Sequence, residues 1–318
     1  MSPGCDRRSV SPELVTSIGS VELPNPVLTA SGTAGHGVEL AAFFPLDRLG
    51  AVVVKSLTAY DWPGNAAPRV HAAGAGMINS VGLQGPGVTA WRRDTLPALA
   101  ASGARVVASI WGRTLDDYAR AAEQLAGAPG LVAVEVNVSC PNLEDRSRMF
   151  AHSPEATEAA VAASGSAGLP RWAKLSPNTD RLVDVAAAAL AGGAEALILV
   201  NTVLGMVIDV EQRRPVLGAG GGGLSGPPVH AVAVRAVYEV RSALGDIPLV
   251  GVGGVCDAVS AVELMLAGAA AVEVGTATFA DPRAPIRVLE DLEAWCRAHG
   301  VGALDELIGG AHGHARPT

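Results

Sequence analysis

The sequence predicts a single-domain α/β protein that folds as a closed (β/α)8 barrel, or TIM barrel. Short apolar runs recur along the 318 residues, and each is followed by a turn and then an alanine-rich helical stretch. Eight such units in one chain are typical of a (β/α)8 barrel. The runs are apolar throughout, as parallel strands that are buried on both faces require. An open, doubly wound sheet built from the same units is the alternative.

The apolar runs place the strands, and the stretches between them place the helices. We expect strands at Pro26–Ser31, Ala51–Ser56, Arg105–Ile110, Leu131–Ser139, Arg171–Ser176, Ala196–Thr202, Pro248–Gly254 and Ala271–Gly275. Several expected helices are followed by glycine, the residue that a helix C-terminus prefers. The expected helices include Leu115–Ala126, Pro154–Ala163, Thr179–Ala191, Pro227–Leu244 and Ala258–Ala267.

Two connections are longer than a plain barrel needs, Leu57–Ala104 and Val203–Ile247. Both carry glycine and proline clusters, and long loops after strands usually serve binding. No composition shift marks a second core. We therefore expect an N-terminal extension over residues 1–19, a (β/α)8 barrel domain over 20–305 with extended loops at its C-terminal face, and a disordered tail over 306–318.

Composition excludes several classes of protein. Apolar residues make up 49% of the chain and charged residues 17%, which suits a large buried core and not a disordered chain. The net charge of −8 argues against nucleic-acid binding. No signal peptide is readable, and the apolar runs are too short to span a membrane. The 4 cysteines form no CxxC pair and the histidines have no metal-ligand spacing, so we expect a cytoplasmic protein without a metal site.

Polar residues close the expected strands at one end, which in a barrel is the catalytic face. A polar residue at a strand end can also simply begin a turn. Two lysines inside apolar runs, Lys55 and Lys174, are harder to explain in that way, because burying an ammonium is costly unless a polar ligand meets it. The strand-end residues are Ser31, Lys55, Ser56, Ser109, Asn137 to Cys140, Lys174, Ser176, Asn201 and Thr202.

Glycines follow the last two expected strands, at Gly253-Gly254 and Gly275-Thr276. Barrel enzymes often bind a phosphate there through backbone N–H groups, although a pair of tight turns would explain the same residues. The run Gly218–Gly223 also matches GxGxxG, but it does not lead from a strand directly into a helix. We interpret it as a mobile glycine loop and not as a dinucleotide fingerprint.

The segment Asn137–Asn142 (NVSCPN) places two amides on either side of one thiol at the end of the fourth strand. An amide both donates and accepts hydrogen bonds, so it suits a planar ligand with carbonyl and N–H edges. A free cysteine is often a small buried apolar residue. At a barrel mouth, Cys140 is also a candidate nucleophile or general base.

With these motifs together, the chain resembles the class 1 dihydroorotate dehydrogenases. The resemblance runs from about Ser20 to about Arg283, and the motifs stand in the family's order. It implies an FMN flavoprotein, an oxidoreductase that converts (S)-dihydroorotate to orotate in pyrimidine (UMP) biosynthesis. The motifs are NVSCPN, Met77–Gly87 (MINSVGLQGPG), Lys174–Asn178 (KLSPN), Gly222–Pro227 (GGLSGP), Gly251–Val255 (GVGGV) and Gly275–Pro282 (GTATFADP).

The resemblance also implies roles for individual residues. Cys140 would be the general base that removes the C5 proton of dihydroorotate while a hydride passes from C6 to flavin N5. Lys55 would contact both substrate and flavin, and Lys174 would offset the negative charge of reduced flavin. The other substrate residues would be Asn79, Ser80, Val81, Gly82, Leu83, Asn137, Asn142, Asn201 and Thr202. The other FMN residues would be Ser31, Ser56, Ser109, Asn137, Val200, Gly226, Gly253, Gly254, Gly275 and Thr276.

Within class 1, the segments Gly82–Gly87 and Gly222–Pro227 resemble the 1B type. That type works with an iron–sulfur and FAD subunit that passes electrons to NAD, and family members form homodimers. The chain departs from the family at Ser109, where asparagine is usual, and in the charged segment Leu143–Ser153. These departures keep open a flavin oxidoreductase acting on another dihydropyrimidine. A non-catalytic paralogue is the third reading.

Overall fold

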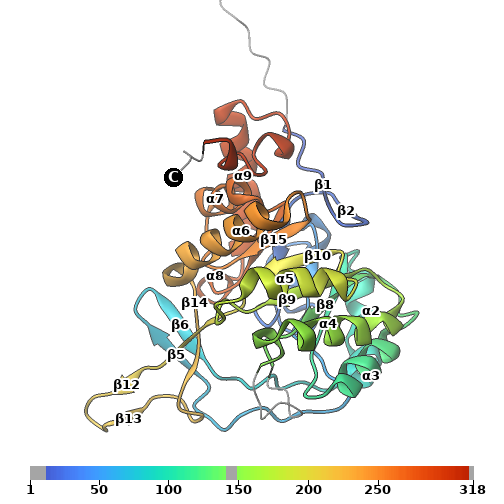
Figure 1. The fold of residues 1–318 in the computed structure, drawn as a ribbon, viewed down its shortest axis with the longest axis vertical. Helices are drawn as coiled ribbons and strands as arrows, with labels where there is room; N and C mark the ends of the chain where they lie inside the picture. Colours follow the sequence, from blue (N-terminus) through green and yellow to red (C-terminus); the bar gives the residue numbers. More distant parts are fainter. Residues whose placement is uncertain (1–11, 141–148, 315–318) are drawn as a thin grey trace, which may run out of the picture.

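The computed structural model describes residues 12–140 and 149–314. An eight-stranded parallel sheet lies at its centre, and helices surround it (Figure 1). Their hydrogen-bonded order is β3-β16-β15-β10-β9-β8-β7-β4. The strands are β3 (Val27–Thr29), β4 (Val52–Val53), β7 (Val106–Ile110), β8 (Leu131–Asn137), β9 (Arg171–Leu175), β10 (Ala196–Leu199), β15 (Leu249–Val252) and β16 (Ala271–Val274).

The two ends of this sheet meet, so the barrel closes. Leu28 of β3 forms a parallel bridge with Ala51, just before β4. The Thr29 N–H donates to the Ala51 carbonyl oxygen at 3.3 Å. This contact confirms the (β/α)8 barrel and excludes the open doubly wound sheet. Each of the eight expected strands is present, although most are a few residues shorter than the apolar runs.

Helices cover the outside of the barrel and connect its strands. The expected helices are confirmed, but two start three residues late: α5 begins at Leu182, and α6 begins at His230 because Pro227–Val229 form a 3-10 turn. Reciprocal capping boxes at Thr114 and Asp257 fix the starts of α3 and α7. The helices are α1 (Val88–Asp94), α2 (Leu96–Ala101), α3 (Leu115–Leu125), α4 (Pro154–Ala163), α5 (Leu182–Ala191), α6 (His230–Leu244), α7 (Ala258–Ala267), α8 (Ala277–Ala280) and α9 (Ala284–His299).

An N-terminal hairpin, β1 (Thr16–Ile18) with β2 (Val21–Leu23), packs into the end of the barrel interior that lies opposite the carboxyl ends of the strands. Ile18 and Leu23 are fully buried and belong to the same apolar cluster as Trp172 inside the barrel. The predicted domain boundary at residue 20 falls between the two strands of this hairpin, whose apolar side chains fill one core.

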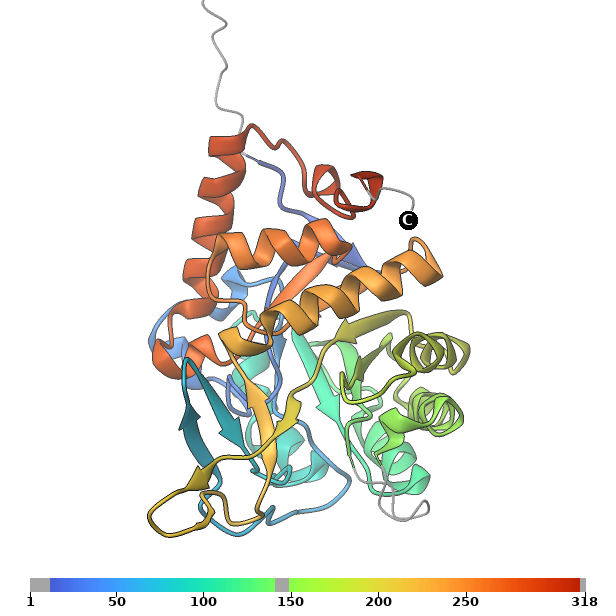
Figure 2. The same cartoon turned by 60° about the vertical axis from the view of Figure 1, so that its left-hand side comes forward.

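The two long connections do not remain loops. Strands β5 (Val70–Ala73) and β6 (Gly76–Asn79) come from the first, and β11 (Val203–Gly205) and β14 (Gly222–Ser225) from the second. They pair as an antiparallel sheet in the order β11-β14-β6-β5 (Figure 2). The predicted mobile glycine loop is thus wrong in part, because Gly222 and Gly223 are strand residues paired with other strands of this sheet.

A second hairpin, β12 (Ile208–Asp209) with β13 (Arg214–Pro215), projects beyond this sheet at the lower left of Figure 1. It leaves Met206, Ile208 and Val210 exposed. No helix within the two described ranges is long and apolar enough to cross a membrane.

The tail predicted to be disordered is packed against the barrel over its described part. Leu307 is buried, and the Gly309 N–H donates to the carbonyl oxygen of Met265 in α7. His312 stacks on Tyr238 of α6 with ring centroids 4.1 Å apart. Residues of this segment contact α6 and α7. The polar composition of the tail did not predict these contacts.

We predict that Trp172→Ala lowers the free energy of unfolding by about 3–5 kcal/mol, because it empties the end of the barrel interior that lies opposite the carboxyl ends of the strands. Trp172 is fully buried, and its indole N–H has no partner among the described residues. Trp172→Phe should cost clearly less, since it keeps a ring and removes an unpaired donor. Urea unfolding followed by circular dichroism measures both variants. An alanine variant that loses less than about 1 kcal/mol would contradict the packing described.

Candidate active site

A cavity of about 810 Å³ opens at the carboxyl ends of the barrel strands. The barrel supplies its floor and one wall. The antiparallel sheet supplies another wall through Met77, Asn79, Leu204 and Ser225. The two long connections therefore fold into a structure that bounds the cavity.

Most of the residues predicted for the site line this one cavity. The exceptions among described residues are Ser109 and Cys140, and Asn142 lies outside the described residues. The predicted residues that line it are Ser31, Lys55, Ser56, Asn79, Ser80, Val81, Gly82, Leu83, Asn137, Lys174, Val200, Asn201, Thr202, Gly226, Gly253, Gly254, Gly275 and Thr276.

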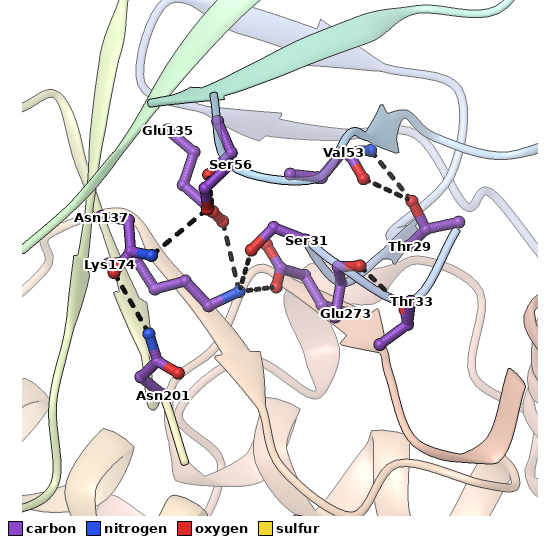
Figure 3. Close-up of polar contacts among 12 residues, drawn as sticks. Thr29, Ser31, Thr33, Val53, Ser56, Glu135, Asn137, Lys174, Asn201 and Glu273 are labelled. Carbon is purple, nitrogen blue, oxygen red and sulfur yellow. Dashed lines mark hydrogen bonds and ion pairs between the residues drawn. The ribbon is translucent and has the colours of Figure 1, made fainter. Parts of the chain in front are cut away.

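The floor of the cavity holds Lys174 between two buried carboxylates (Figure 3). Its Nζ lies 2.7 Å from Oε2 of Glu273 and 3.3 Å from Oε2 of Glu135. The ammonium also donates to Ser31 Oγ at 3.4 Å. The three charged side chains come from β9, β16 and β8, and all point into the barrel. We call Glu135, Lys174 and Glu273 the carboxylate–lysine cluster.

Burial and charge act in opposite directions within this cluster. Burial disfavours the ammonium of Lys174, but the carboxylates of Glu135 and Glu273 outweigh it and raise the pKa of Lys174. Burial, together with repulsion by Glu135, raises the pKa of Glu273 to about 8, although Lys174 works against this rise. Lys174 is therefore charged at neutral pH, and Glu273 is the member that can gain a proton.

Ser109 lies below the cavity and contacts this cluster. Its hydroxyl is fully buried, donates to Glu135 Oε1 at 2.6 Å and lies 2.8 Å from Ser56 Oγ. The serine side chain is short, so its hydroxyl reaches Glu135 and does not line the cavity. Ser56, one contact further on, does line it.

Two amides form the wall beside Lys174. Asn137 donates through Nδ2 to Ser56 Oγ at 3.2 Å, and its Oδ1 accepts from Nδ2 of Asn201, also at 3.2 Å. The backbone N–H of Ser139 donates to the same Oδ1 at 3.1 Å. These bonds fix which edge of each amide faces the cavity, so the wall presents donors and acceptors in set positions.

Lys55 reaches the cavity from the end of the second barrel strand. Burial lowers the pKa of Lys55, and the nearby Arg69 lowers it further. No salt bridge to Lys55 occurs within the described part of the chain. An anionic ligand in the cavity would therefore meet a cation that the protein does not neutralise.

Glycines form the opposite end of the cavity. Gly253 and Gly254 have φ angles of +139° and +72°, which L-residues with side chains rarely adopt. A Cβ on Gly254 would lie 2.7 Å from the Cβ of His230 at the start of α6. This end therefore brings backbone, without side chains, against whatever occupies the cavity.

Cys140 lies beside the cavity but does not line it. Its thiol is fully buried and donates to the Asn137 carbonyl oxygen at 3.4 Å, the same oxygen to which Tyr118 donates at 2.7 Å. Burial raises the pKa of the Cys140 thiol to about 12, against smaller opposing effects of hydrogen bonds with Tyr118 and the Gly112 backbone. In this arrangement the sulfur is a neutral thiol.

Sequence reasoning missed the two carboxylates and an aromatic group at the cavity. Glu135 and Glu273 interrupt apolar strands, which is the same signal that singled out Lys174. Trp62, Trp111 and Arg113 also line the cavity, and the Arg113 guanidinium lies 4.9 Å from the centre of the Trp62 ring. Trp111 and Arg113 follow β7, whereas Trp62 lies in the connection after β4, and nothing in the sequence indicates that Trp62 meets the other two.

We predict that iodoacetamide at pH 8 modifies Cys140 about a thousandfold more slowly than an exposed thiol of ordinary pKa, because the thiolate is the reactive form. Peptide mass spectrometry follows each cysteine separately, with exposed Cys256 as the internal comparison. The rate at Cys140 should rise about tenfold per pH unit from 8 to 10. The urea-unfolded chain is the control, and equal rates at the two cysteines in the native protein would refute the buried thiol.

Comparison with known proteins identifies the family. The model of the dihydroorotate dehydrogenase family matches residues 13–295. A Desulforudis audaxviator protein named dihydroorotate dehydrogenase B (NAD(+)), catalytic subunit, is 49% identical over 93% of this chain and 96% of its own length. A Geotalea uraniireducens protein of the same name is 40% identical over 94% of this chain and 98% of its own.

A Solibacter usitatus relative, 44% identical over 94% of this chain and 99% of its own length, carries a provisional name of the A (fumarate) type. The relatives' names thus differ in the electron acceptor and agree in the enzyme. The match begins at residue 13, seven residues before the predicted barrel boundary and just ahead of the β1–β2 hairpin. The chain is an oxidoreductase of the dihydroorotate dehydrogenase family, with catalytic subunits of the class 1B type among its relatives.

Proposed function

We propose that this protein binds FMN and oxidises (S)-dihydroorotate to orotate in pyrimidine biosynthesis. The observation that carries the proposal is the cavity itself. One end is lined by glycine backbone, the floor by Lys174 on its buried carboxylates, and one wall by oriented amides. A phosphate group suits the glycine backbone, an electron-accepting ring suits Lys174, and a planar pyrimidine suits the amide wall.

The residues present fit FMN in their chemistry. Glycines at positive φ leave room for a phosphate against Gly253 and Gly254. Lys174 would lie at the N1–C2 carbonyl edge of the ring, where negative charge gathers on reduction. When bound, FMN supplies the acceptor for the hydride that leaves C6 of dihydroorotate. Ser31, Ser56, Val200, Gly226, Gly275 and Thr276 would complete its site, with Ser109 acting indirectly through Ser56 and Glu135.

The substrate would lie against the amide wall. Asn137 and Asn201 are already joined by a hydrogen bond, so their remaining donors and acceptors have fixed directions. Asn79 approaches from the antiparallel sheet, where its amide donates to the Gly223 carbonyl oxygen at 3.4 Å. Lys55 would attract the carboxylate of dihydroorotate. Ser80, Val81, Gly82, Leu83 and Thr202 would enclose the ring, and we assign Asn142 to the same set by its motif.

We assign to Cys140 the role of the general base that removes the C5 proton of dihydroorotate. Its neighbours Asn137 and Ser139 both line the cavity, which supports a short path from the sulfur to the substrate. The buried thiol pairs with the Asn137 carbonyl oxygen. We propose that the side chain turns from this bond toward the cavity when substrate is bound, so that the thiol loses its proton only in the complex.

The two electrons taken from dihydroorotate would then pass from the flavin to a second electron carrier. The names of the relatives in Desulforudis audaxviator and Geotalea uraniireducens contain both NAD and the words catalytic subunit. These names support a separate electron-transfer subunit, which we propose carries an iron–sulfur cluster and FAD. We further propose a homodimer as the core of the assembly, in the cytoplasm. For the domain plan we propose one barrel unit from about residue 13 through the packed tail.

We expect the purified chain to be yellow and its flavin absorbance to bleach when dihydroorotate is added without oxygen. This titration tests cofactor and substrate together. A yellow protein that bleaches with dihydrouracil and not with dihydroorotate would move the substrate and keep the chemistry. A chain that cannot be loaded with FMN would refute the proposal. Fumarate, NAD and a quinone would then distinguish the acceptors.

We predict that Cys140→Ala retains FMN but reduces it with dihydroorotate at least a thousandfold more slowly, because the base is lost and the cofactor cradle is intact. Stopped-flow absorbance measures the rate, and Cys296→Ala is the matched control because Cys296 is a buried thiol away from the cavity. A folded Cys140→Ala protein that has lost its FMN, or that is reduced at the wild-type rate, would remove Cys140 from the proposed role.

A further inference from the structure

The carboxylate–lysine cluster holds one more negative charge than its lysine can balance. With both carboxylates ionised, Glu135, Lys174 and Glu273 together carry a charge of −1, and neither glutamate side chain is exposed to solvent. Anchoring a flavin edge needs Lys174 and one carboxylate to hold it. The second carboxylate weakens the attraction of Lys174 for an anion, so it calls for a separate explanation.

The two glutamates differ in how their oxygens are used. Glu135 accepts from Ser109 through Oε1 at 2.6 Å and from Lys174 through Oε2 at 3.3 Å. Glu273 accepts from Lys174 through Oε2 at 2.7 Å, but its buried Oε1 has no hydrogen-bond partner among the described residues. A proton on Glu135 would reverse its hydrogen bond with Ser109 or break its bond with Lys174, whereas a proton on Oε1 of Glu273 would disturb no existing bond.

Among the described residues, the charged groups that face Glu273 are Lys174 and Glu135. Its register partners on the neighbouring strands are Leu28 of β3 and Val252 of β15, which are both apolar. Ser31, after β3, contributes an uncharged hydroxyl that contacts the same ammonium. The charge of Glu273 therefore responds to Lys174, Glu135 and a ligand above them.

We propose that Glu273 is a positioning residue that takes up one proton when the bound flavin is reduced, and so leaves Lys174 free to face the reduced ring. This inference rests on the proposed function, because it requires FMN above Lys174. A hydride brings two electrons and one proton to the flavin and leaves it with one added negative charge. One proton from water then binds Oε1 of Glu273, and the total charge of the site is unchanged.

Electrostatics favours this proton uptake. A new negative charge near the cluster raises the cost of keeping both carboxylates ionised in a medium of low dielectric constant. The pKa of Glu273 is already raised to about 8 by burial and by Glu135. A carboxyl group with such a pKa is still largely ionised just above pH 8, so a modest added negative potential changes its protonation there.

The experiment reduces the FMN-loaded protein electrochemically, without dihydroorotate, and records the infrared difference spectrum between the two redox states at pH 8.5. We expect a protonated-carboxyl band to appear on reduction in the wild type and to be absent in Glu273→Gln. Glu290→Gln, on a surface glutamate paired with Arg48, is the matched control and should keep the band. Absence of the band in the wild type overturns the inference without any variant.

The reduction potential gives a second and independent measurement. Above pH 8, Glu273→Gln should bind reduced FMN at least tenfold more tightly relative to oxidised FMN than the wild type does, which equals about 30 mV for a two-electron couple. At pH 6 the difference should shrink, because Glu273 is then protonated in both redox states. A difference that does not change with pH would mean that Glu273 acts as a structural group and not by gaining a proton.

The two proposals fail in different ways. A chain that binds no FMN refutes the proposed function. A chain that binds FMN and is reduced by dihydroorotate, but takes up no proton on Glu273, refutes the inference alone. If Glu273→Gln does not fold, the wild-type infrared band and the pH dependence of the wild-type potential still decide the question.

Discussion

The ion pairs of Lys174 with Glu135 and Glu273 are the constraint on which the site depends. They lie between the apolar cluster that fills the barrel around Trp172 and the cavity at the carboxyl ends of the strands. Inward-pointing residues alternate along each strand, so Trp172 and Lys174 on β9 occupy successive interior layers. Three buried charges are tolerable only because each has a partner, and their mutual contacts fix the ends of β8, β9 and β16 relative to one another. Removal of Lys174 would leave both carboxylates without a cation, whereas removal of either glutamate would leave Lys174 one carboxylate partner.

The rest of the cavity follows from that fixed layer. Ser109 and Ser56 connect Glu135 to Asn137, and Asn137 connects to Asn201, so hydrogen bonds run from the buried floor to the amide wall. The opposite wall has another origin, since β6 and β14 come from segments that are far apart in the sequence and pair only in the folded chain. The barrel thus positions charges and amides, while the antiparallel sheet encloses the space above them.

Patterns over short stretches of sequence predicted the barrel well, because each β-α unit is built from residues that are close together in the chain. Apolar runs located all eight strands, and capping residues such as Asp257 located helix starts. The features that sequence reasoning missed are set by contacts between distant segments. Glycine-rich β14 has no strand character of its own and becomes a strand by pairing with β6 and β11. Glu135 and Glu273 are both visible as charges in apolar runs, but only the closed barrel shows that they meet at one lysine. The packed tail depends on a docking surface on α6 and α7 that its own residues do not reveal.

Cys140 illustrates how one backbone position can couple the cavity to a group outside it. The side-chain amide of Asn137 lies in the cavity wall, while its carbonyl oxygen accepts from both Tyr118 and the Cys140 thiol. A ligand that moves this amide therefore also acts on the strand end that holds the sulfur. A rise in pKa from the 9.0 of a free thiol to about 12 corresponds to roughly 4 kcal/mol against forming the thiolate. In the proposed complex, substrate bound to the amides, Lys55 and Asn79 would supply the binding energy that offsets this cost. A reactive thiolate would then form only in the complex, and the resting sulfur would be kept from oxidation.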